Sequence, residues 1–553
     1  MSSTPAKRPI GELLKDRGYI SDEHISYALQ QQKITRERIG ELLDRLGFVT
    51  KFDLLTALAE QHGVPYIDLD EILPDEKILT MFNKNILLNN SFLPLNIYAQ
   101  TIDVAVEDPS DPKLAPLIRR QTGLDPVFYL ADGKKIINAV NQFYYFFENP
   151  VEKTVEKEIN ILSADSEGVR GMDSLIKHIL HMAVKMRATD IHIQPMQKSI
   201  TISFRIDSVM HSIMSLPVAL NRFVSSIKLK ADMDIAEQRL PQDGRFSMNV
   251  LNNAYDFRVS TIVSQHGEDM VLRILPKEGT KKGIKELGFY DEHIRLIEQL
   301  FNEPSGIILI TGPTGSGKST TLYAGISKIN LIKKNVITVE DPVEYHIPLL
   351  RQTQVNLKAG YSFSSAIRHF LRHDPDVILV GEIRDQDTAA TAVTASNTGH
   401  LVLSTLHTNT AVGAVSRLRD LGVRPFLIAD TLLAVVSQRL VRRICNGCKD
   451  MYQPSEEETA YLRDPSITEL FKGRGCDLCG GTGYQGRTLV YELFLVNDEI
   501  ATMIDTNADM SLIARKARET GSVDIFDVTL AKVKQGITTT EEAMRVLGHT
   551  RQT

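Results

Sequence analysis

A short glycine-rich segment near the middle of the chain has the residue types that hold a phosphate group. The segment is Gly312-Pro313-Thr314-Gly315-Ser316-Gly317-Lys318-Ser319; it follows an apolar run that predicts a buried strand, and Thr320 leads into a predicted helix. Glycines let backbone N–H groups turn toward phosphate oxygens, and a helix N-terminus adds partial positive charge. Lys318 would then reach the β- and γ-phosphates, and the Ser319 hydroxyl would ligate Mg²⁺. The segment therefore predicts a site for a nucleoside triphosphate such as ATP, rather than a turn without a ligand.

Acidic and imidazole groups follow three further apolar runs. Glu382 ends one of them, and at the carboxyl end of a parallel strand it could polarise the attacking water or the Mg²⁺ shell. Glu340 ends another, with Asp341 and Glu344 close behind, and these carboxylates could bind metal or order water. His407 follows the third, where an imidazole can hydrogen-bond a γ-phosphate. We expect Glu382, Glu340 and His407 to be catalytic; a strand cap, a solvated loop and a core histidine are the respective alternatives.

All four cysteines of the chain lie in two CxxC pairs. Cys445 and Cys448 form the first pair and Cys476 and Cys479 the second, with 27 residues between the pairs. Two such knuckles can close a tetrahedral thiolate site for Zn²⁺, and disulfides are rare in cytosolic proteins. Four thiolates leave no open coordination position, so we expect structural rather than catalytic zinc.

Length and composition limit the classes of protein. A chain of 553 residues is too long for one core, and 24% charged with 42% hydrophobic residues is typical of a globular protein. A net charge of −6 argues against a general nucleic-acid binder. No apolar stretch approaches the length of a membrane span, and the N-terminus lacks the apolar core of a secretory signal. We expect a cytoplasmic protein.

The N-terminal region contains an internal repeat. Gly11-Glu12-Leu13-Leu14 recurs 29 residues later as Gly40-Glu41-Leu42-Leu43, and Gly18-Tyr19-Ile20-Ser21 recurs as Gly47-Phe48-Val49-Thr50. Each copy predicts a short helix, a glycine turn, an N-cap and a second helix.

Periodicity predicts a multidomain α/β protein whose nucleotide domain has a mostly parallel sheet. We expect an N-terminal domain over 1–149 (repeat at about 8–62, α/β continuation at 66–149), a linker over 150–169 that could instead form a short amphipathic helix, an α/β domain over 170–280, a nucleotide domain over 281–443, a cysteine segment over 444–490 and a helical segment over 491–553.

Four motifs in order, GPTGSGKST, ITVEDPVEY, DPDVILVGEIRD and TGHLVLSTLHTN, closely resemble those of the secretion-ATPase family. That family drives type II secretion and type IV pilus assembly and retraction. The resemblance implies a homohexamer of RecA-like ATPase domains, each preceded by a PAS-like domain. It also implies a Walker A loop over 312–319, an Asp box at Glu340, a Walker B motif ending at Glu382 and a His box at His407.

The segment DIAEQRLPQDGR over 234–245 is also similar to the family. There, arginines of the PAS-like domain reach the triphosphate, and such an arginine neutralises charge that develops in the transition state. Carried onto this sequence, the resemblance favours Arg239 and Arg245, with Arg205 and Arg273 as further candidates. Ordinary surface salt bridges are the alternative role.

The repeat resembles the cyclic di-GMP-binding domain of assembly ATPases named after the MSHA pilus. The second copy matches that pattern at Arg38, Leu58 and Gln61, and the first copy at Leu29 and Gln32. The first copy has Pro9 where the family has arginine, and proline cannot replace a guanidinium contact. Asp108, after a later predicted strand, could accept a guanine N–H. A helical docking domain without a ligand is the alternative.

Together these features predict a cytoplasmic hexameric ATPase that assembles a pilus or a secretion pseudopilus. The resemblance implies an inner-membrane platform protein and a cytoplasmic docking protein as partners, which would hold the ATPase at the membrane, and no nucleic acid. A retraction motor is disfavoured, because retraction motors lack the cysteine knuckles and the long N-terminal region. A nucleic-acid translocase and a non-hydrolysing regulator are the remaining alternatives.

Overall fold

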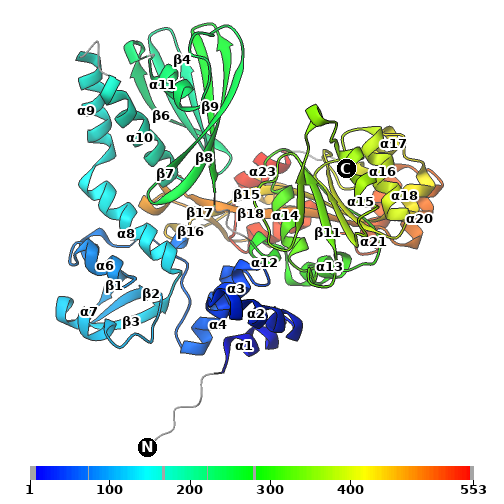
Figure 1. Ribbon diagram of the computed structural model, residues 1–553, viewed down its shortest axis with the longest axis horizontal. Helices are drawn as coiled ribbons and strands as arrows, with labels where there is room; N and C mark the ends of the chain where they lie inside the picture. Colours follow the sequence, from blue (N-terminus) through cyan, green and yellow to red (C-terminus); the bar gives the residue numbers. More distant parts are fainter. Residues whose placement is uncertain (1–7, 73, 165–168, 221, 278–281, 549–553) are drawn as a thin grey trace, which may run out of the picture. The chain divides into compact units, whose positions relative to one another are not determined.

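The computed structural model describes residues 8–72, 74–164, 169–220, 222–277 and 282–548 (Figure 1). Contacts divide the chain into two compact units, one formed by residues 1–57 and 281–553 and the other by residues 58–280. The predicted mixed α/β fold is confirmed, and the first unit holds the parallel sheet. The predicted domain boundaries stay predictions. Residues 1–7 of the predicted N-terminal domain and residues 165–168 of the predicted linker lie outside the described residues.

A seven-stranded sheet forms the centre of the first unit. Its strands, in spatial order, are β12 (Arg351–Gln354), β11 (Val336–Glu340), β13 (Val377–Val380), β14 (Leu401–Leu406), β10 (Gly306–Thr311), β15 (Leu432–Ile444) and β18 (Tyr484–Leu495). Neighbouring strands pair in parallel except β15 and β18, which are antiparallel. Strands β10, β11, β13 and β14 are buried along their whole length, as expected for parallel strands covered on both faces.

Helices cover both faces of this sheet. One core contains Ile307 and Leu309 of β10, and the other contains Ile308 and Ile310, because successive side chains of a strand alternate between faces. The covering helices are α12 (Ile284–Leu287), α13 (Asp291–Leu300), α14 (Lys318–Ile326), α15 (Phe363–Phe370), α16 (Gln386–Asn397), α17 (Gly413–Asp420) and α18 (Pro425–Thr431).

The C-terminal part of the same unit adds a two-stranded sheet, five α-helices and a short 3₁₀-helix (Asp477–Cys479) to the described fold. These elements are β16 (Lys449–Tyr452), α19 (Glu456–Leu462), β17 (Leu470–Gly473), α20 (Asp498–Asp505), α21 (Met510–Glu519), α22 (Ile525–Lys534) and α23 (Thr540–Leu547). The buried carboxylate of Glu542 accepts a hydrogen bond of 2.7 Å from Arg442 Nε, which ties α23 to β15.

The N-terminal repeat folds as helix, glycine turn and helix in each copy. Its helices are α1 (Ile10–Asp16), α2 (Asp22–Thr35), α3 (Ile39–Arg45) and α4 (Lys51–His62). Gly18 and Gly47 hold equivalent left-handed turns, with φ of 74° and 79°. At the start of α4 the Thr50 hydroxyl accepts the Asp53 N–H at 3.1 Å, a capping contact that the sequence predicted.

The second unit contains two separate sheets. The first is three-stranded, with β1 (Phe92–Tyr98) antiparallel to β2 (Thr101–Val106) and β2 parallel to β3 (Asp125–Leu130). Helices α5 (Glu76–Leu79), α6 (Lys84–Asn89), α7 (Leu114–Thr122) and α8 (Gly133–Glu148) accompany this sheet. Helix α9 (Val151–Ala164) occupies most of the predicted linker, which corresponds to the helical alternative for that segment.

The other sheet of this unit is six-stranded and fully antiparallel. In spatial order it contains β6 (Val209–Pro217), β5 (Ser199–Ile206), β4 (Ala188–Pro195), β9 (Gly267–Pro276), β8 (Asn253–Ser264) and β7 (Gln242–Val250). Helices α10 (Val169–Lys185) and α11 (Arg222–Lys230) contribute to the core formed with one face of the sheet. The strands alternate between buried and more exposed residues, so the opposite face is open to solvent. Among the described residues, no helix is both long and apolar enough to span a membrane.

Candidate nucleotide site

The glycine-rich segment joins β10 to α14 at the carboxyl edge of the parallel sheet. Gly315 and Gly317 have φ of 78° and 87°, values that an L side chain rarely adopts. Gly312 has φ of 135°, and a Cβ at this position would lie 2.3 Å from the main-chain oxygen of Gln438. Glycine is therefore required at Gly312 by two independent constraints, backbone conformation and a close approach of β15.

The groups of this loop fit a triphosphate. Lys318 Nζ donates to the carbonyl oxygens of Gly312 and Pro313 at 2.9 and 3.2 Å, so the ammonium group lies over the loop. Burial lowers the pKa of Lys318, and Glu382 opposes that shift. The Ser316 hydroxyl oxygen is buried without a hydrogen-bond partner among the described residues, so this hydroxyl is available to donate to a phosphate oxygen. Ser319 lies exposed in the first turn of α14, where its oxygen is a suitable ligand for Mg²⁺.

Glu382 and His407, predicted separately, lie together next to this loop. Glu382 follows β13, His407 follows β14, and their carboxylate Oε2 and imidazole Nε2 atoms are 3.7 Å apart. Arg384 contacts the other carboxylate oxygen of Glu382 at 2.6 Å. The sequence prediction missed Arg384, although it lies inside one of the four motifs, two residues after the acid.

Glu340, unlike Glu382, accepts hydrogen bonds from uncharged side chains of neighbouring elements. It is buried at the end of β11, and it accepts hydrogen bonds from the Tyr323 hydroxyl, from Thr338 Oγ1 at 2.6 Å and from Gln352 Nε2 at 3.3 Å. Burial and the bond to Glu340 both raise the pKa of Tyr323. Because Tyr323 belongs to α14, Glu340 links β11 to the helix that carries Lys318. The exposed carboxylates of Asp341 and Glu344 follow it.

Arginines form a row across the open face of the six-stranded sheet. Arg245 pairs in register with Arg258, Arg258 with Arg273, Arg273 with Asp190, and Asp190 with Arg205. Asp190 lies 2.9 Å from Arg273 and 3.8 Å from Arg205, measured between Oδ and Nε atoms. Arg245, Arg258 and Arg273 line a surface hollow of about 600 Å³.

Arg245, Arg258 and Arg273 are like charges directly opposite one another on adjacent strands, an arrangement that is destabilising. Asp190 offsets part of this repulsion at Arg273, and Asp256 offsets part of it at Arg245. Arg258 was not predicted, because only the strand register reveals it. Arg239 is exposed in the preceding loop, outside the row, where its backbone N–H donates to Glu237 Oε1 at 2.6 Å. Salt bridges, the alternative role, do occur for Arg205 and Arg273.

The repeat residues predicted to contact cyclic di-GMP are found on several elements. Arg38 is exposed as the N-cap residue of α3, and Leu29 on α2 is 47% exposed. Gln32 Nε2 donates to the Glu37 carbonyl oxygen at 2.8 Å. Leu58 and Gln61 are partly buried on the end of α4 that belongs to the second unit. Asp108, in the same unit, accepts the Ser110 N–H at 2.9 Å.

Pro9 replaces arginine without changing the backbone. It has φ of −56° and ψ of 139° as the N-cap residue of α1, and Arg38 has −66° and 140° as the equivalent residue of α3. The first copy therefore keeps the turn but lacks the guanidinium group and the backbone N–H that arginine would supply at this position.

The four cysteines come together as predicted. Their sulfur atoms all lie within 4.8 Å of one another, with Sγ–Sγ distances of 3.8 Å for Cys445–Cys476, 3.9 Å for Cys448–Cys479 and 3.8 Å for Cys476–Cys479. A tetrahedral zinc site with Zn–S bonds of about 2.3 Å has sulfur–sulfur edges of about 3.8 Å. The donor set and spacing thus fit a tetrathiolate metal site.

Backbone N–H groups support this site. Cys479 Sγ accepts from the N–H groups of Cys476 and Gly483, both at 3.2 Å, and Cys448 Sγ accepts from Gly475 at 3.3 Å. Burial raises the pKa of the Cys479 thiol, but these N–H groups and the neighbouring thiols outweigh it and lower the pKa to about 7. These N–H groups therefore favour the thiolate form of Cys479, whereas burial raises the pKa of the Cys445 and Cys448 thiols.

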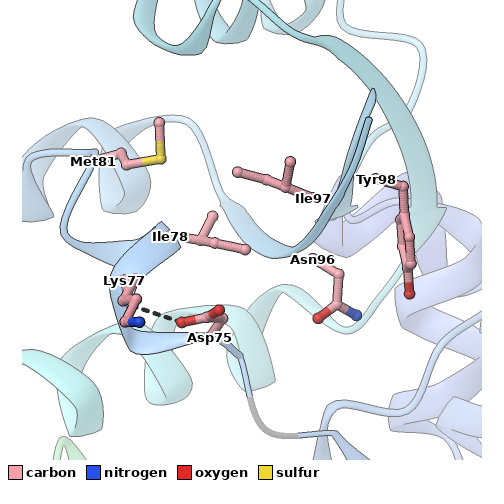
Figure 2. A pocket seen from close by; sticks show the side chains of 7 residues that line it. All are labelled: Asp75, Lys77, Ile78, Met81, Asn96, Ile97 and Tyr98. Carbon is pink, nitrogen blue, oxygen red and sulfur yellow. Dashed lines mark hydrogen bonds between the residues drawn. The ribbon is translucent and has the colours of Figure 1, made fainter. Parts of the chain in front are cut away.

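A further hollow lies between α5 and the end of β1. Figure 2 shows Ile78 and Ile97 directed into it, with Met81, Asn96 and Tyr98 around it. Asp75 Oδ1 accepts the Lys77 N–H at 2.8 Å and so caps α5. The lining therefore combines apolar side chains with the polar side chains of Asp75, Lys77 and Asn96.

Comparison with known proteins places these features in context. The sequence profile described as "Type II/IV secretion system protein" matches residues 165–545, and the MshEN domain profile matches residues 62–149, after most of the repeat. Type II secretion system ATPase E of Vibrio cholerae is 46% identical over 69% of this chain and 76% of its own length. Type IV pilus assembly ATPase PilB of Myxococcus xanthus is 34% identical over 98% of both chains. The X-ray structure of the Legionella pneumophila ATPase DotB aligns with a TM-score of 0.50 at 20% identity, over 67% of this chain and 94% of that one, which indicates a shared fold.

We expect Glu382→Gln to lower kcat for ATP hydrolysis about 10²- to 10⁴-fold, because the amide cannot accept a proton from the attacking water. ATP affinity should change little, since the phosphate-binding loop stays intact. Steady-state hydrolysis and binding of a fluorescent ATP analogue measure the two effects, with Glu303→Gln as an exposed control. An unchanged kcat would exclude Glu382 from the chemical step.

We expect Cys479→Ser to abolish stoichiometric zinc in the purified protein and to lower its melting temperature, because a hydroxyl is a poor replacement for a thiolate ligand. Metal analysis by mass spectrometry measures the zinc content. Asp477→Asn, a change in the same turn that removes no sulfur, is the control. Equal zinc in the two variants would contradict a four-cysteine site.

Proposed function

The chain belongs to the type II/IV secretion system protein family, and from this we propose that it is a hexameric motor that assembles a type IV pilus or a type II secretion pseudopilus. The resemblance drawn from the four motifs is confirmed, and the protein is an ATP-hydrolysing enzyme, as its relatives ATPase E and PilB are. The observation that carries the proposal is the meeting of Lys318, Glu382 and His407 at the carboxyl edge of the parallel sheet.

The proposed roles follow from position. Residues 312–320 hold the triphosphate and Mg²⁺, Glu382 orients and deprotonates the attacking water, and His407 hydrogen-bonds the γ-phosphate. Glu340 binds metal or orders water, as its place after β11 predicts, and it also positions α14 through Tyr323. Zn²⁺ held by the four cysteines stabilises the segment that follows β15.

Hexamer formation is supported by the arginine row. Asp190 contacts Arg273 and Arg205, Asp256 interacts electrostatically with Arg245, and Asp243 lines the same hollow. We propose that the triphosphate bound to a neighbouring subunit lies against Arg245 and Arg258. The negative charge of the triphosphate would relieve the repulsion between these arginines, and their positive charge would stabilise the transition state of hydrolysis. Arg239, in the adjacent loop, contributes to the same subunit boundary.

The N-terminal region is the proposed regulatory and docking part. Its repeat presents Arg38 and Leu29 at the surface, and its MshEN domain covers residues 62–149. We assign it to cyclic di-GMP binding and to contact with a cytoplasmic docking protein, while the motor acts on a platform protein of the inner membrane. Retraction is disfavoured by the presence of the cysteine cluster, and nucleic-acid translocation by the net charge of −6.

The arginine assignment predicts complementation between two inactive variants. Lys318→Ala and Arg258→Ala should each hydrolyse ATP at least about a hundred times more slowly than wild type, because one loses phosphate binding and the other transition-state neutralisation. Mixed in equal amounts and reassembled, the two variants should recover about a quarter of wild-type activity. An intact site needs Lys318 from one subunit and Arg258 from its neighbour, and random assembly places two such subunits side by side in about a quarter of the sites.

Unmixed variants and Arg120→Ala, an exposed arginine of α7, are the controls. No recovery on mixing would mean that Arg258 acts on its own chain or on no nucleotide. A protein that stays monomeric with ATP and Mg²⁺ by light scattering would contradict the hexamer.

Cyclic di-GMP binding is tested by titrating labelled ligand into the full chain. We expect submicromolar affinity that Arg38→Ala abolishes, because the guanidinium is the charged contact that the first copy lacks at Pro9. Arg36→Ala, two residues earlier and also exposed, should bind normally. An absence of binding up to about 100 μM would leave the ATPase in place and make the repeat a docking domain.

A further inference from the structure

We propose that Gln438, a residue of β15, is a positioning residue for the phosphate-binding loop. Its side chain is completely buried. Its Nε2 donates to the Ser316 carbonyl oxygen at 2.8 Å, and its Oε1 accepts from Thr321 Oγ1 at 2.9 Å. One amide therefore holds both the loop and the first turn of α14 against the strand next to β10.

Both bonds require an amide. Ser316 and Thr321 are also buried, so water cannot replace a partner that is lost. Glutamine supplies a donor to one and an acceptor to the other, whereas a carboxylate supplies only acceptors and methionine supplies neither. A buried polar group left without its partner is costly, and this cost favours glutamine at this position of the strand.

The hydrogen bond from Gln438 to the Ser316 carbonyl oxygen also orients the backbone N–H of Gly317. In a trans peptide the N–H of one residue points opposite to the preceding carbonyl. Because Gln438 draws the Ser316 carbonyl toward β15, the Gly317 N–H is directed away from β15. Backbone N–H groups of this loop are the donors expected to hold phosphate oxygens. Gln438 thus controls the direction of one donor without contacting the nucleotide.

The bond to Thr321 fixes the helix. Thr321 lies three residues after Lys318, on the first turn of α14, which also carries Ser319. At Gly312 the main chain of Gln438 approaches the other end of the loop so closely that only glycine fits there. Strand β15 therefore contacts the loop at its start through its main chain and at its end through one side chain.

The sequence contains a weak signal for this role, a single amide in the largely apolar segment LLAVVSQRLV over 432–441, where Ser437 and Arg439 are its polar neighbours. A buried glutamine could instead serve only to stabilise the fold. The two roles differ in what they change: a purely structural bond affects stability alone, whereas a positioning bond affects nucleotide affinity in protein that is fully folded.

The test measures the Kd for fluorescent ADP, together with KM and kcat for ATP, on the full chain. This proposal rests on the nucleotide-binding role of the loop, which ADP binding by the wild type would support. If the wild type does not bind ADP, both that role and the proposal are overturned. We expect Gln438→Met to raise Kd and KM at least ten-fold. Thr321→Val should raise them about three-fold, and Thr321→Ser, which keeps the hydroxyl, should restore them.

Thr529→Val is the matched control. Its hydroxyl is buried on α22 and donates to the Ile525 carbonyl oxygen at 2.7 Å, so the change removes a comparable bond far along the chain from the loop. It should lower the melting temperature and leave Kd unchanged. Folded Gln438→Met that binds ADP within two-fold of wild type would overturn the proposal. If Gln438→Met does not fold, an unchanged Kd for ADP in Thr321→Val would overturn the proposal instead.

Discussion

Parallel strand pairing is the constraint on which the nucleotide site depends. Because β10, β11, β13 and β14 run in one direction, the residues that follow them meet at one edge of the sheet. Pairing of this kind is stable only when both faces are covered, and the two cores on either side of β10 meet that requirement. The apolar residues that stabilise the unit therefore also determine where Lys318, Glu382 and His407 lie.

The antiparallel sheet of the second unit handles charge in another way. One of its faces is buried and the other is open, so charged side chains can lie across the middle of the sheet rather than at strand ends. Asp190 and Asp256 compensate part of the arginine row, whose like charges lie directly opposite one another on adjacent strands. An anion bound at Arg245 and Arg258, as we propose, would offset this repulsion, so its binding would also stabilise the fold.

The sequence predicted those parts of the site that depend on local patterns. The phosphate loop, the helical repeat and the four cysteines are contiguous motifs whose backbone demands can be stated from residue types. Glu382 and His407 could be assigned to one edge because each follows an apolar run in a predicted parallel sheet. Arg258 and Gln438 could not be found in this way, because their roles depend on which strands pair and in which register. The bond between Glu340 and Tyr323 likewise depends on tertiary packing between a strand and a helix.

Strand β15 passes the phosphate loop at Gln438 and ends next to Cys445. Successive residues of a strand face opposite ways, so adding or removing one residue between these two positions would turn one of them to the wrong side. The pairing with β18 already contains an irregularity between Arg442 and Ile444, which sets how the strand reaches the cysteine. The number of residues between Gln438 and Cys445 is therefore constrained as strongly as their identities. A relative with a different spacing would need a compensating bulge within the same strand.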